Sequence, residues 1–205
     1  MPAEIAALLI GDPPDVWSAL GFVVDDGAVH VSGVRHILGG ASPGISEWSM
    51  RGVDASDIDG LALTLPVAPA QPTPDHPNGV LGLDHLVVGS PDVTRTIGAL
   101  EAAGIGLRRT RDVPAGRSPV AMLQAFFRLG EVILELVGPA EGAGDGAPSL
   151  FGLAWTVRDL DETASFLGKR LRPAKDAVQP GRRIATLDRA LGGSTVSMAF
   201  MSADA

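Results

Sequence analysis

Two residues in the middle of the chain carry side chains suited to chemistry and lie in strand-like surroundings. His85 lies in the run Leu83–Val88, and Glu135 lies in the apolar run Glu131–Val137. A carboxylate in such a run is costly to bury unless a metal, a cation or a hydrogen-bonding partner compensates it. Imidazole nitrogen and carboxylate oxygen suit a divalent ion such as Zn, Fe, Mn or Ni. We therefore take His85 and Glu135 as candidate catalytic and metal-binding residues.

Both residues also have simpler explanations. Strand alternation predicts that His85 points to the opposite face from Asp84, where it could be a hydrogen-bonded residue at a sheet edge or pocket wall. Glu135 could form a salt bridge, with Arg128 or Arg183 as the partner. The sequence leaves these alternatives open.

Four further residues are candidates for contacting a substrate. Gln124 and Phe126 share one face of a predicted strand, so both could line the same pocket. Trp155 could supply an aromatic wall, with core packing as the alternative. Arg182 and Arg183 follow a turn at 179–181 and could present a guanidinium to an anionic substrate, with Arg183 as the candidate contact, or the pair could simply be solvated.

Three other arginines and three histidines have simpler explanations. The strand at 106–112 is expected to be exposed, with its arginines at positions 108, 109 and 111 in water. His76 lies in a proline-rich stretch and is predicted to be solvated. His30 and His36 lie in a predicted hairpin, with no partner identified.

Composition excludes several classes of protein. The 205 residues are 45% hydrophobic and 20% charged, which is typical of a globular chain. The net charge of −8 argues against nucleic acid or an anionic membrane as a partner. The absence of cysteine excludes disulfides, zinc–thiolate sites and cysteine nucleophiles. With no apolar run of about 18 residues and no signal peptide, we expect a cytoplasmic protein that binds a small molecule.

The elements that must position these residues fall into three segments. Residues 1–66 form the first, 67–80 form a proline-rich linker, and 81–205 contain two modules at 81–139 and 150–203. Each module is predicted as a strand, a helix and three strands, with helices at 93–103 and 160–171 because apolar residues recur at helical spacing. The first segment is predicted to be similar in outline, with a hairpin that turns at 25–27.

The two modules are internal repeats. An offset of 67 places His85 on Gly152 and Ile97 on Ala164 without a gap. The first segment carries a similar opening with one inserted proline. Two strand–helix–three-strand units side by side would form a cup, and a concave surface of this kind is where ligands bind.

The chain resembles the vicinal oxygen chelate superfamily, the glyoxalase/bleomycin-resistance/dioxygenase proteins, and is closest in pattern to glyoxalase-like proteins of unassigned activity. The resemblance is carried by Leu83–Val88, Phe126–Val137 and Leu153–Thr163. It covers residues 81–202 well and 1–66 only in outline. It implies an α+β fold of tandem βαβββ modules that form a cupped mixed sheet, with an additional degenerate N-terminal module.

The resemblance also implies where a metal would bind. Members of the superfamily that use a metal take a His or Gln from the first strand of each module and a Glu from the last. His85 and Glu135 match both positions in the first of the two modules. The second module has Gly152 and, near the Glu position, Ala199. The predicted metal site is therefore incomplete, since catalytic sites generally use three protein ligands.

Three hypotheses follow for the function. The first is a small-molecule-binding protein without an obligatory metal. The second is a divalent-metal-dependent lyase, isomerase or ring-cleaving dioxygenase. The third is an oligomerisation or regulatory role with segment one as the interface, which either covers the open face of a module or meets its symmetry mate. Because three modules leave one open face unpaired, the sequence predicts a homodimer.

Overall fold

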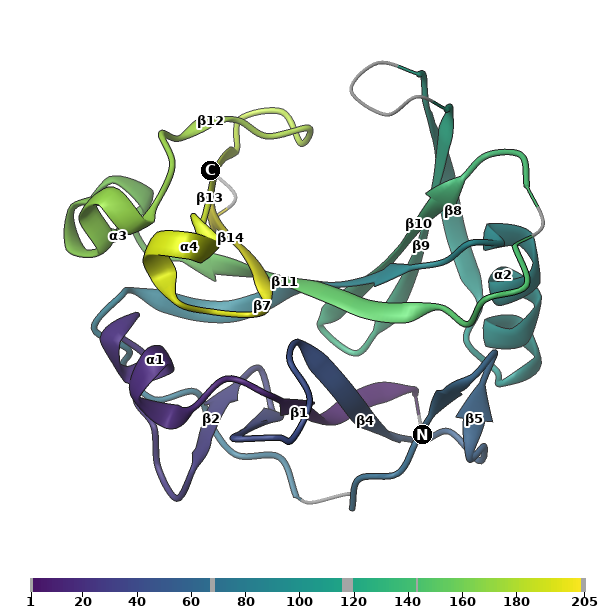
Figure 1. Ribbon diagram of the computed structural model, residues 1–205, viewed down its shortest axis with the longest axis horizontal. Helices are drawn as coiled ribbons and strands as arrows, with labels where there is room; N and C mark the ends of the chain where they lie inside the picture. Colours follow the sequence, from purple (N-terminus) through teal and green to yellow (C-terminus); the bar gives the residue numbers. More distant parts are fainter. Residues whose placement is uncertain (1, 67–68, 116–119, 143, 204–205) are drawn as a thin grey trace.

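The computed structural model describes residues 2–66, 69–115, 120–142 and 144–203, and shows a mixed α+β fold (Figure 1). An eight-stranded sheet dominates it. In spatial order its strands are β12 (Lys175–Asp176), β13 (Arg183–Thr186), β14 (Ser197–Ser202), β11 (Ser149–Val157), β7 (Val80–Gly89), β10 (Val132–Pro139), β9 (Met122–Leu129) and β8 (Leu107–Val113). Strands β7 and β11 form the floor of a cup, and the outer strands rise on either side as its arms (Figure 1).

The eight strands come from two modules with the same topology. In each module the first strand pairs in parallel with the last, β7 with β10 and β11 with β14. The two first strands then pair antiparallel with each other, with His85 opposite Ala154 and Val87 opposite Gly152. The offset of 67 carries residue 85 to 152 and residue 87 to 154. Each of these two pairs therefore joins one residue to the repeat equivalent of the other pair's first-module residue, as expected for two copies related by a twofold axis. The predicted repeat and the predicted cupped sheet are thus confirmed.

A helix covers the outer side of each arm. Helix α2 (Val93–Ala102) contacts β9 and β10, and helix α3 (Leu160–Leu167) contacts β13 and β14. Each begins at an aspartate whose carboxylate accepts from free backbone amides of the first turn: Asp92 for α2 and Asp159 for α3. Helix α3 is shorter than predicted, because residues 168–170 continue as a 3-10 turn η1 (Gly168–Arg170). No helix among the described residues is both long and apolar enough to cross a bilayer.

The first segment forms a second sheet beneath the cup. Its strands, in spatial order, are β2 (Ala28–Val31), β3 (Val34–Leu38), β1 (Glu4–Ile10) and β4 (Ile45–Arg51). Helix α1 (Pro14–Ala19) connects β1 to β2. Strand β1 is parallel to β3 and antiparallel to β4. The unit β1–α1–β2–β3 is therefore one strand shorter than the other modules, as a degenerate module would be.

The hairpin of this segment turns at a different place from the one predicted. Ser32 and Gly33 join β2 to β3, and both have positive φ, at 53° and 71°. Two such residues form the tight turn that matches the twist of paired strands. The predicted strand at 22–24 is not formed, and residues 25–28 make only an isolated bridge. In the last module, the short helix α4 (Arg189–Gly192) precedes the final strand β14.

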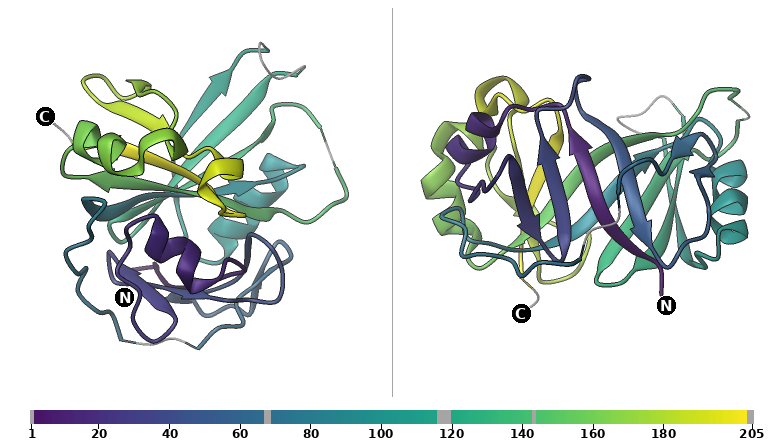
Figure 2. Two further views of the ribbon diagram at one scale, coloured as in Figure 1. Left: turned by 60° about the vertical axis from the view of Figure 1, so that its left-hand side comes forward. Right: turned by 90° about the horizontal axis from the view of Figure 1, so that it is seen from below.

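The four-stranded sheet packs against the underside of the floor, as Figures 1 and 2 both show. Trp17 and Trp155 meet edge to face between the layers, with ring centroids 5.9 Å apart, and both are fully buried. Phe22 and His36 pack around Trp155 at 5.1 and 5.2 Å. Segment one therefore already has a covering surface within the chain. The expectation that its open face needs a second subunit was wrong, and the homodimer itself stays a prediction.

The linker is fastened along this layer. His76 is 2% exposed, and its Nδ1 accepts from the Val23 backbone amide at 3.0 Å, so the prediction that His76 is solvated was wrong. Asn78 donates to the Leu20 carbonyl at 2.9 Å. The linker lacks strand pairing because prolines remove donors, yet side-chain hydrogen bonds hold its described residues in place.

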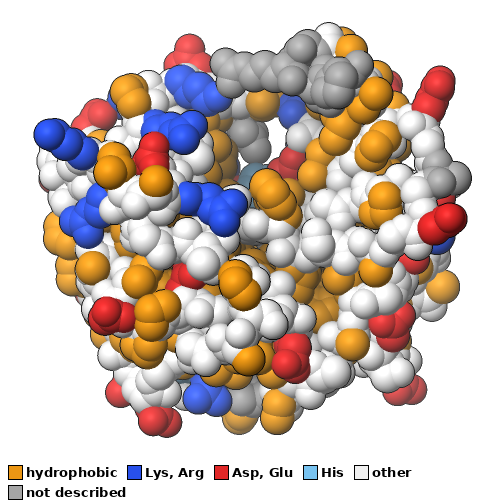
Figure 3. Space-filling model, in the orientation of Figure 1, with side chains coloured by type: hydrophobic (Ala, Val, Ile, Leu, Met, Phe, Trp, Pro, Cys, Tyr) orange, Lys and Arg blue, Asp and Glu red, His pale blue; other side chains and the backbone are white. Residues whose placement is uncertain are grey.

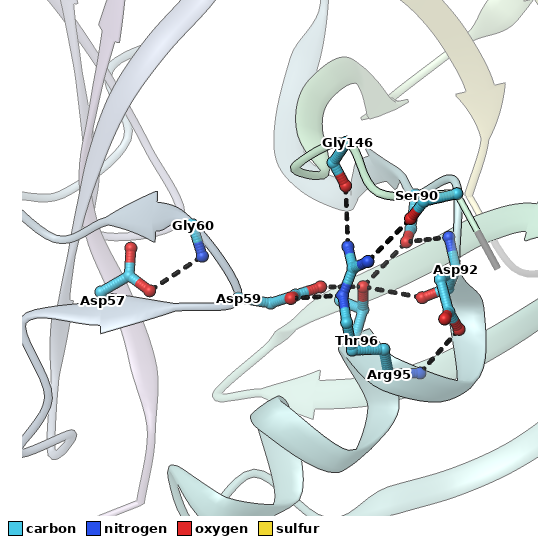
Figure 4. Close-up of polar contacts among 9 residues, drawn as sticks. Asp57, Asp59, Gly60, Ser90, Asp92, Arg95, Thr96 and Gly146 are labelled. Atoms are coloured by element: carbon cyan, nitrogen blue, oxygen red, sulfur yellow. Dashed lines mark hydrogen bonds and ion pairs between the residues drawn. The ribbon is translucent and has the colours of Figure 1, made fainter.

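A small hairpin connects the lower layer to the outer side of one arm (Figure 4). Strands β5 (Asp57–Ile58) and β6 (Leu61–Ala62) place Asp59 at their turn with a φ of 55°. The Asp59 carboxylate accepts from Arg95 Nε at 2.7 Å and from Thr96 Oγ1 at 2.5 Å, both on α2. Arg95 also donates to the carbonyls of residues 144 and 146, so one side chain joins three segments of the chain.

Candidate functional site

The concave side of the eight-stranded sheet encloses a cavity of about 510 Å³. Its walls come from strands β7 to β11, from β13 and β14, and from residues 175–180 at the rim. The space-filling view shows the hollow opening between the two arms (Figure 3). Of the six predicted site residues, His85, Gln124, Phe126 and Glu135 line this cavity. The volume lies within the range of small-molecule pockets.

His85 is held in the cavity wall by an irregularity in its own strand. Strand β7 pairs residue 85 with Ala154 and residue 83 with Trp155, so Asp84 is an extra residue in a bulge. His85 Nδ1 consequently lies 2.5 Å from Asp84 Oδ1. The prediction that the two side chains point to opposite faces was wrong, because a bulge interrupts the alternation on which it rested.

Asp84 is in turn anchored by two donors. Its Oδ2 accepts from Arg182 Nη2 at 2.6 Å and from Thr156 Oγ1 at 2.9 Å, and Arg182 Nε donates to the Ser202 carbonyl. Burial alone would raise the pKa of Asp84, but the contacts with His85, Arg182 and Thr156 outweigh it and hold that pKa well below its ordinary value. Asp84 is therefore a carboxylate, and it orients His85.

Glu135 lies at the end of a polar chain that crosses the sheet. Its Oε1 accepts from Gln124 Nε2 at 2.5 Å, and Gln124 Oε1 accepts from Arg111 Nε at 2.7 Å. The register aligns these strands, with Gln124 opposite Arg111 and Phe126 opposite Glu135. The alternative of a salt bridge to Arg128 or Arg183 was wrong, since Glu135 is compensated through an amide.

Phe126 and the neighbouring arginines of β8 complete this wall. The Arg109 guanidinium lies over the Phe126 ring, 4.4 Å from its centroid. Arg108 and Arg109 are exposed, as predicted, and Arg111 is half-buried; Arg109 and Arg111 also line the cavity, which the prediction did not anticipate. Strand alternation could have found them together, because positions 109 and 111 share one face of the strand.

Two predicted substrate contacts lie away from the cavity. Trp155 is fully buried between the two sheets, against Trp17 and Phe22. Arg183 is exposed and pairs with Asp161 of α3 at 2.9 Å. Both predicted substrate contacts were wrong for the same reason. Alternation separates the two faces of β11 and of β13, but it does not say which face lines the cup. Arg182, one residue earlier, is the arginine that reaches the site, through Asp84.

The residues present do not make up the metal site that the resemblance implies. Glu135 pairs with Val87 on β7, and Ala199 pairs with Ala154 on β11, so Ala199 occupies the position equivalent to Glu135. Gly152 occupies the position equivalent to His85. A Cβ at Gly152 would lie 2.7 Å from the Ser197 carbonyl oxygen, so a ligating side chain there is sterically excluded. Within the described ranges, no group of three or more His, Cys, Asp or Glu could hold a metal ion.

Known structures share this arrangement of strands. A triple mutant of 4-hydroxymandelate synthase from Streptomyces coelicolor aligns with 100% of this chain and 93% of its own, at 16% identity and a TM-score of 0.66. A variant of homoprotocatechuate 2,3-dioxygenase from B. fuscum aligns with 100% of this chain and 71% of its own, at 13% identity and a TM-score of 0.59. This chain has the vicinal oxygen chelate fold.

Another neighbour covers a smaller share of the chain. Methylmalonyl-CoA epimerase from Mycobacterium tuberculosis aligns with 62% of this chain and 91% of its own, at 18% identity and a TM-score of 0.48. No protein-family profile and no curated protein sequence matches the chain. The vicinal oxygen chelate fold predicted from the sequence is thus confirmed, and at these identities the comparisons establish the fold alone.

Proposed function

We propose that this protein binds an organic small molecule in the cup, and that no divalent ion is required. The cavity of about 510 Å³ carries the proposal, because it brings His85 and Glu135 into one wall while Gly152 and Ala199 stand at the other two ligand positions. A site with two such donors lacks the three protein ligands of an ordinary catalytic metal centre.

In this proposal the lining residues divide the work of binding. His85, oriented by Asp84, and Glu135, hydrogen-bonded by Gln124, provide polar contacts on the floor of the cup. Phe126 provides apolar contact area on the wall, where it is 7% exposed. Few polar groups placed among apolar walls are what orient a ligand in a pocket of this size.

The second candidate is a divalent-metal-dependent lyase, isomerase or ring-cleaving dioxygenase. The observation in its favour is that His85 and Glu135 line the same cavity in a fold shared with a 2,3-dioxygenase. This function requires at least one further metal ligand besides His85 and Glu135. Position 152 cannot supply it, because a side chain there would displace the Ser197 backbone. Metal analysis separates the two candidates.

The deciding experiment measures metal content by mass spectrometry after loading untagged protein with Zn, Fe, Mn and Ni. The variants are His85→Ala and, as a matched control, His30→Ala, which lies on β2 outside the cup. The proposal predicts no stoichiometric ion that depends on His85. About one ion per chain, lost in His85→Ala and kept in His30→Ala, would sink the proposal and support the metal enzyme.

Two further parts of the proposal come from the sequence. We propose that the protein is cytoplasmic, since the sequence contains no cysteine. We also propose that it forms a homodimer. Light scattering at micromolar concentration tests the homodimer directly, and a mass equal to one chain would remove it.

A further inference from the structure

The cup carries a charge pattern that the proposed function does not explain. The cavity is lined by three cations, Arg109, Arg111 and Lys175, against two carboxylates, Glu135 and Asp176. The protein as a whole has a net charge of −8. A concave surface whose charge opposes that of the surrounding protein concentrates ligands of the complementary sign. The cup of this acidic protein is therefore suited to an anion.

We infer that the ligand of the cup is an amphipathic anion, with a carboxylate or phosphate head that Arg109 and Arg111 bind and an apolar body that lies along the sheet. This inference rests on the proposed function and names the chemical class of its ligand. Both arginines come from β8, at positions two residues apart, so their side chains leave the same face of the strand.

Arg111 is held in place without being neutralised. Its Nε donates to Gln124 Oε1 at 2.7 Å, and Gln124 in turn donates to Glu135. The amide thus stands between the guanidinium and the nearest carboxylate. A guanidinium has five N–H donors, and this bond uses one of them. The terminal nitrogens of Arg111 remain for a ligand, and no carboxylate of the described chain pairs with them.

Arg109 is positioned by stacking. Its guanidinium lies 4.4 Å from the centroid of Phe126, which fixes its plane against the wall of the cavity. Stacking leaves the in-plane N–H donors unused. Over the described residues Arg109 forms no ion pair with an acidic side chain. Two guanidinium groups that come from positions two residues apart on one strand and line the same cavity suit a carboxylate or a phosphate.

The strand register gives the path of the apolar body. Arg109 lies opposite Phe126, Phe126 opposite Glu135, and Glu135 opposite Val87. Three strand spacings separate β8 from β7, roughly 14 Å along the sheet, and the curvature of the cup shortens the direct path. Apolar side chains such as Met198 and Ile184 line the facing arm. An alkyl or aryl chain whose head is bound at β8 therefore extends towards Glu135 and His85.

The test is isothermal titration calorimetry with three probes that share one tail: octanoate, octyl phosphate and the uncharged octanamide. The protein variants are Arg109→Gln, Arg111→Gln and, as a matched control, Arg108→Gln. Arg108 is exposed and lies outside the cavity lining. The control removes the same charge from the adjacent position, so it reports any general effect of net charge. Unfolding curves without ligand show that each variant is folded.

We expect octanoate or octyl phosphate to bind more tightly than octanamide, and the preference to shrink at high ionic strength. Losing a charged hydrogen-bond donor is expected to weaken anion binding about 10- to 100-fold in Arg109→Gln and Arg111→Gln. Octanamide binding and the Arg108→Gln control are expected to change little. Binding of one anion and not the other identifies the head group as carboxylate or phosphate.

Three outcomes would overturn the inference. The first is that octanamide binds as tightly as the anions. That result would show that the cup takes apolar ligands without regard to charge, and the proposed function would still stand. Equal losses in Arg108→Gln and Arg109→Gln would show a general charge effect. Failure of both anions to bind would also overturn it, whereas the proposed function is judged separately, by the metal analysis.

Discussion

Replacing Asp84 with asparagine is expected to destabilise the fold far more than the same replacement at Asp161. The two aspartates pair with consecutive arginines in the sequence. Arg182 pairs with Asp84 at 2.6 Å, and Arg183 pairs with Asp161 at 2.9 Å. The side chains of the first pair are 8% and 11% exposed, and those of the second are 45% and 73% exposed. Burial, rather than distance, distinguishes the two pairs.

The magnitude follows from the environment of Arg182. Removing one partner of a buried ion pair costs about 3–5 kcal/mol, because the remaining buried charge loses part of the attraction that offsets its desolvation. Asparagine keeps the shape and part of the hydrogen bonding, and Arg182 keeps its bond to the Ser202 carbonyl, so we expect a loss of about 3 kcal/mol. For a chain of this size that loss lowers the melting temperature by roughly 6–12 °C. Asp161→Asn is expected to change stability too little to measure, because exposed pairs are screened.

The same pair gives a pH dependence with a definite sign. The pKa of Asp84 in the folded protein lies well below its ordinary value of 3.8. The unfolded chain therefore binds a proton at this residue first as the pH falls. The stabilisation is fully present above about pH 4 and is lost as the pH falls from there through the lower pKa of the folded carboxyl. The difference between the wild type and Asp84→Asn is expected to shrink over that range.

Urea unfolding followed by tryptophan fluorescence measures both effects, since the chain has three tryptophans. The wild type, Asp84→Asn and Asp161→Asn are compared at neutral pH and in acid. A loss below about 1 kcal/mol for Asp84→Asn would refute the buried-pair argument. Equal losses in the two variants would refute the claim that burial distinguishes the pairs.

Three other predictions concern stability. Burial lowers the pKa of His36 to about 4, so protonation of the unfolded chain is expected to remove up to about 3 kcal/mol of stability as the pH falls from 6.5 to 4; His36→Leu flattens this dependence in urea unfolding, and an unchanged slope would contradict it. Gly152→Ala is expected to destabilise, because its Cβ would lie 2.7 Å from the Ser197 carbonyl oxygen. The control Gly98→Ala lies on α2 with open space around it and is expected to stabilise by up to about 1 kcal/mol in thermal unfolding; the argument fails if both change stability in the same direction. Asp59→Ala is expected to free the hairpin at 57–62 and speed its cleavage in limited proteolysis, and an unchanged cleavage rate would show that the contacts in Figure 4 do not hold it.

Local chemistry made the architecture readable from the sequence. Apolar periodicity predicted the two covering helices, and Asp159 predicted the start of one of them. The repeat offset placed Gly152 at the position equivalent to His85, and the strand register places Ala199 at the position equivalent to Glu135. These features depend on residues a few positions apart or on repeated copies of one module. Both can therefore be recognised in the sequence.

The polar contacts of the site were not predictable in the same way. A single extra residue in β7 brought Asp84 beside His85, where regular alternation separates them. The partner of Asp84 is Arg182, which lies 98 positions away in the sequence. Neither the bulge nor a contact at that separation leaves a local signal, because both depend on how two modules meet.

The sequence by itself determined the modules and the cup they form, because hydrophobic periodicity acts over short distances, and the resemblance to a known superfamily added His85 and Glu135 as residues of the cup. Only the tertiary structure decided which face of each strand is concave. That decision placed Trp155 in the core and Arg109 over the cavity. A strand has two faces with the same two-residue period, and packing of the four-stranded sheet against one side of the floor determines which of them remains open to a ligand.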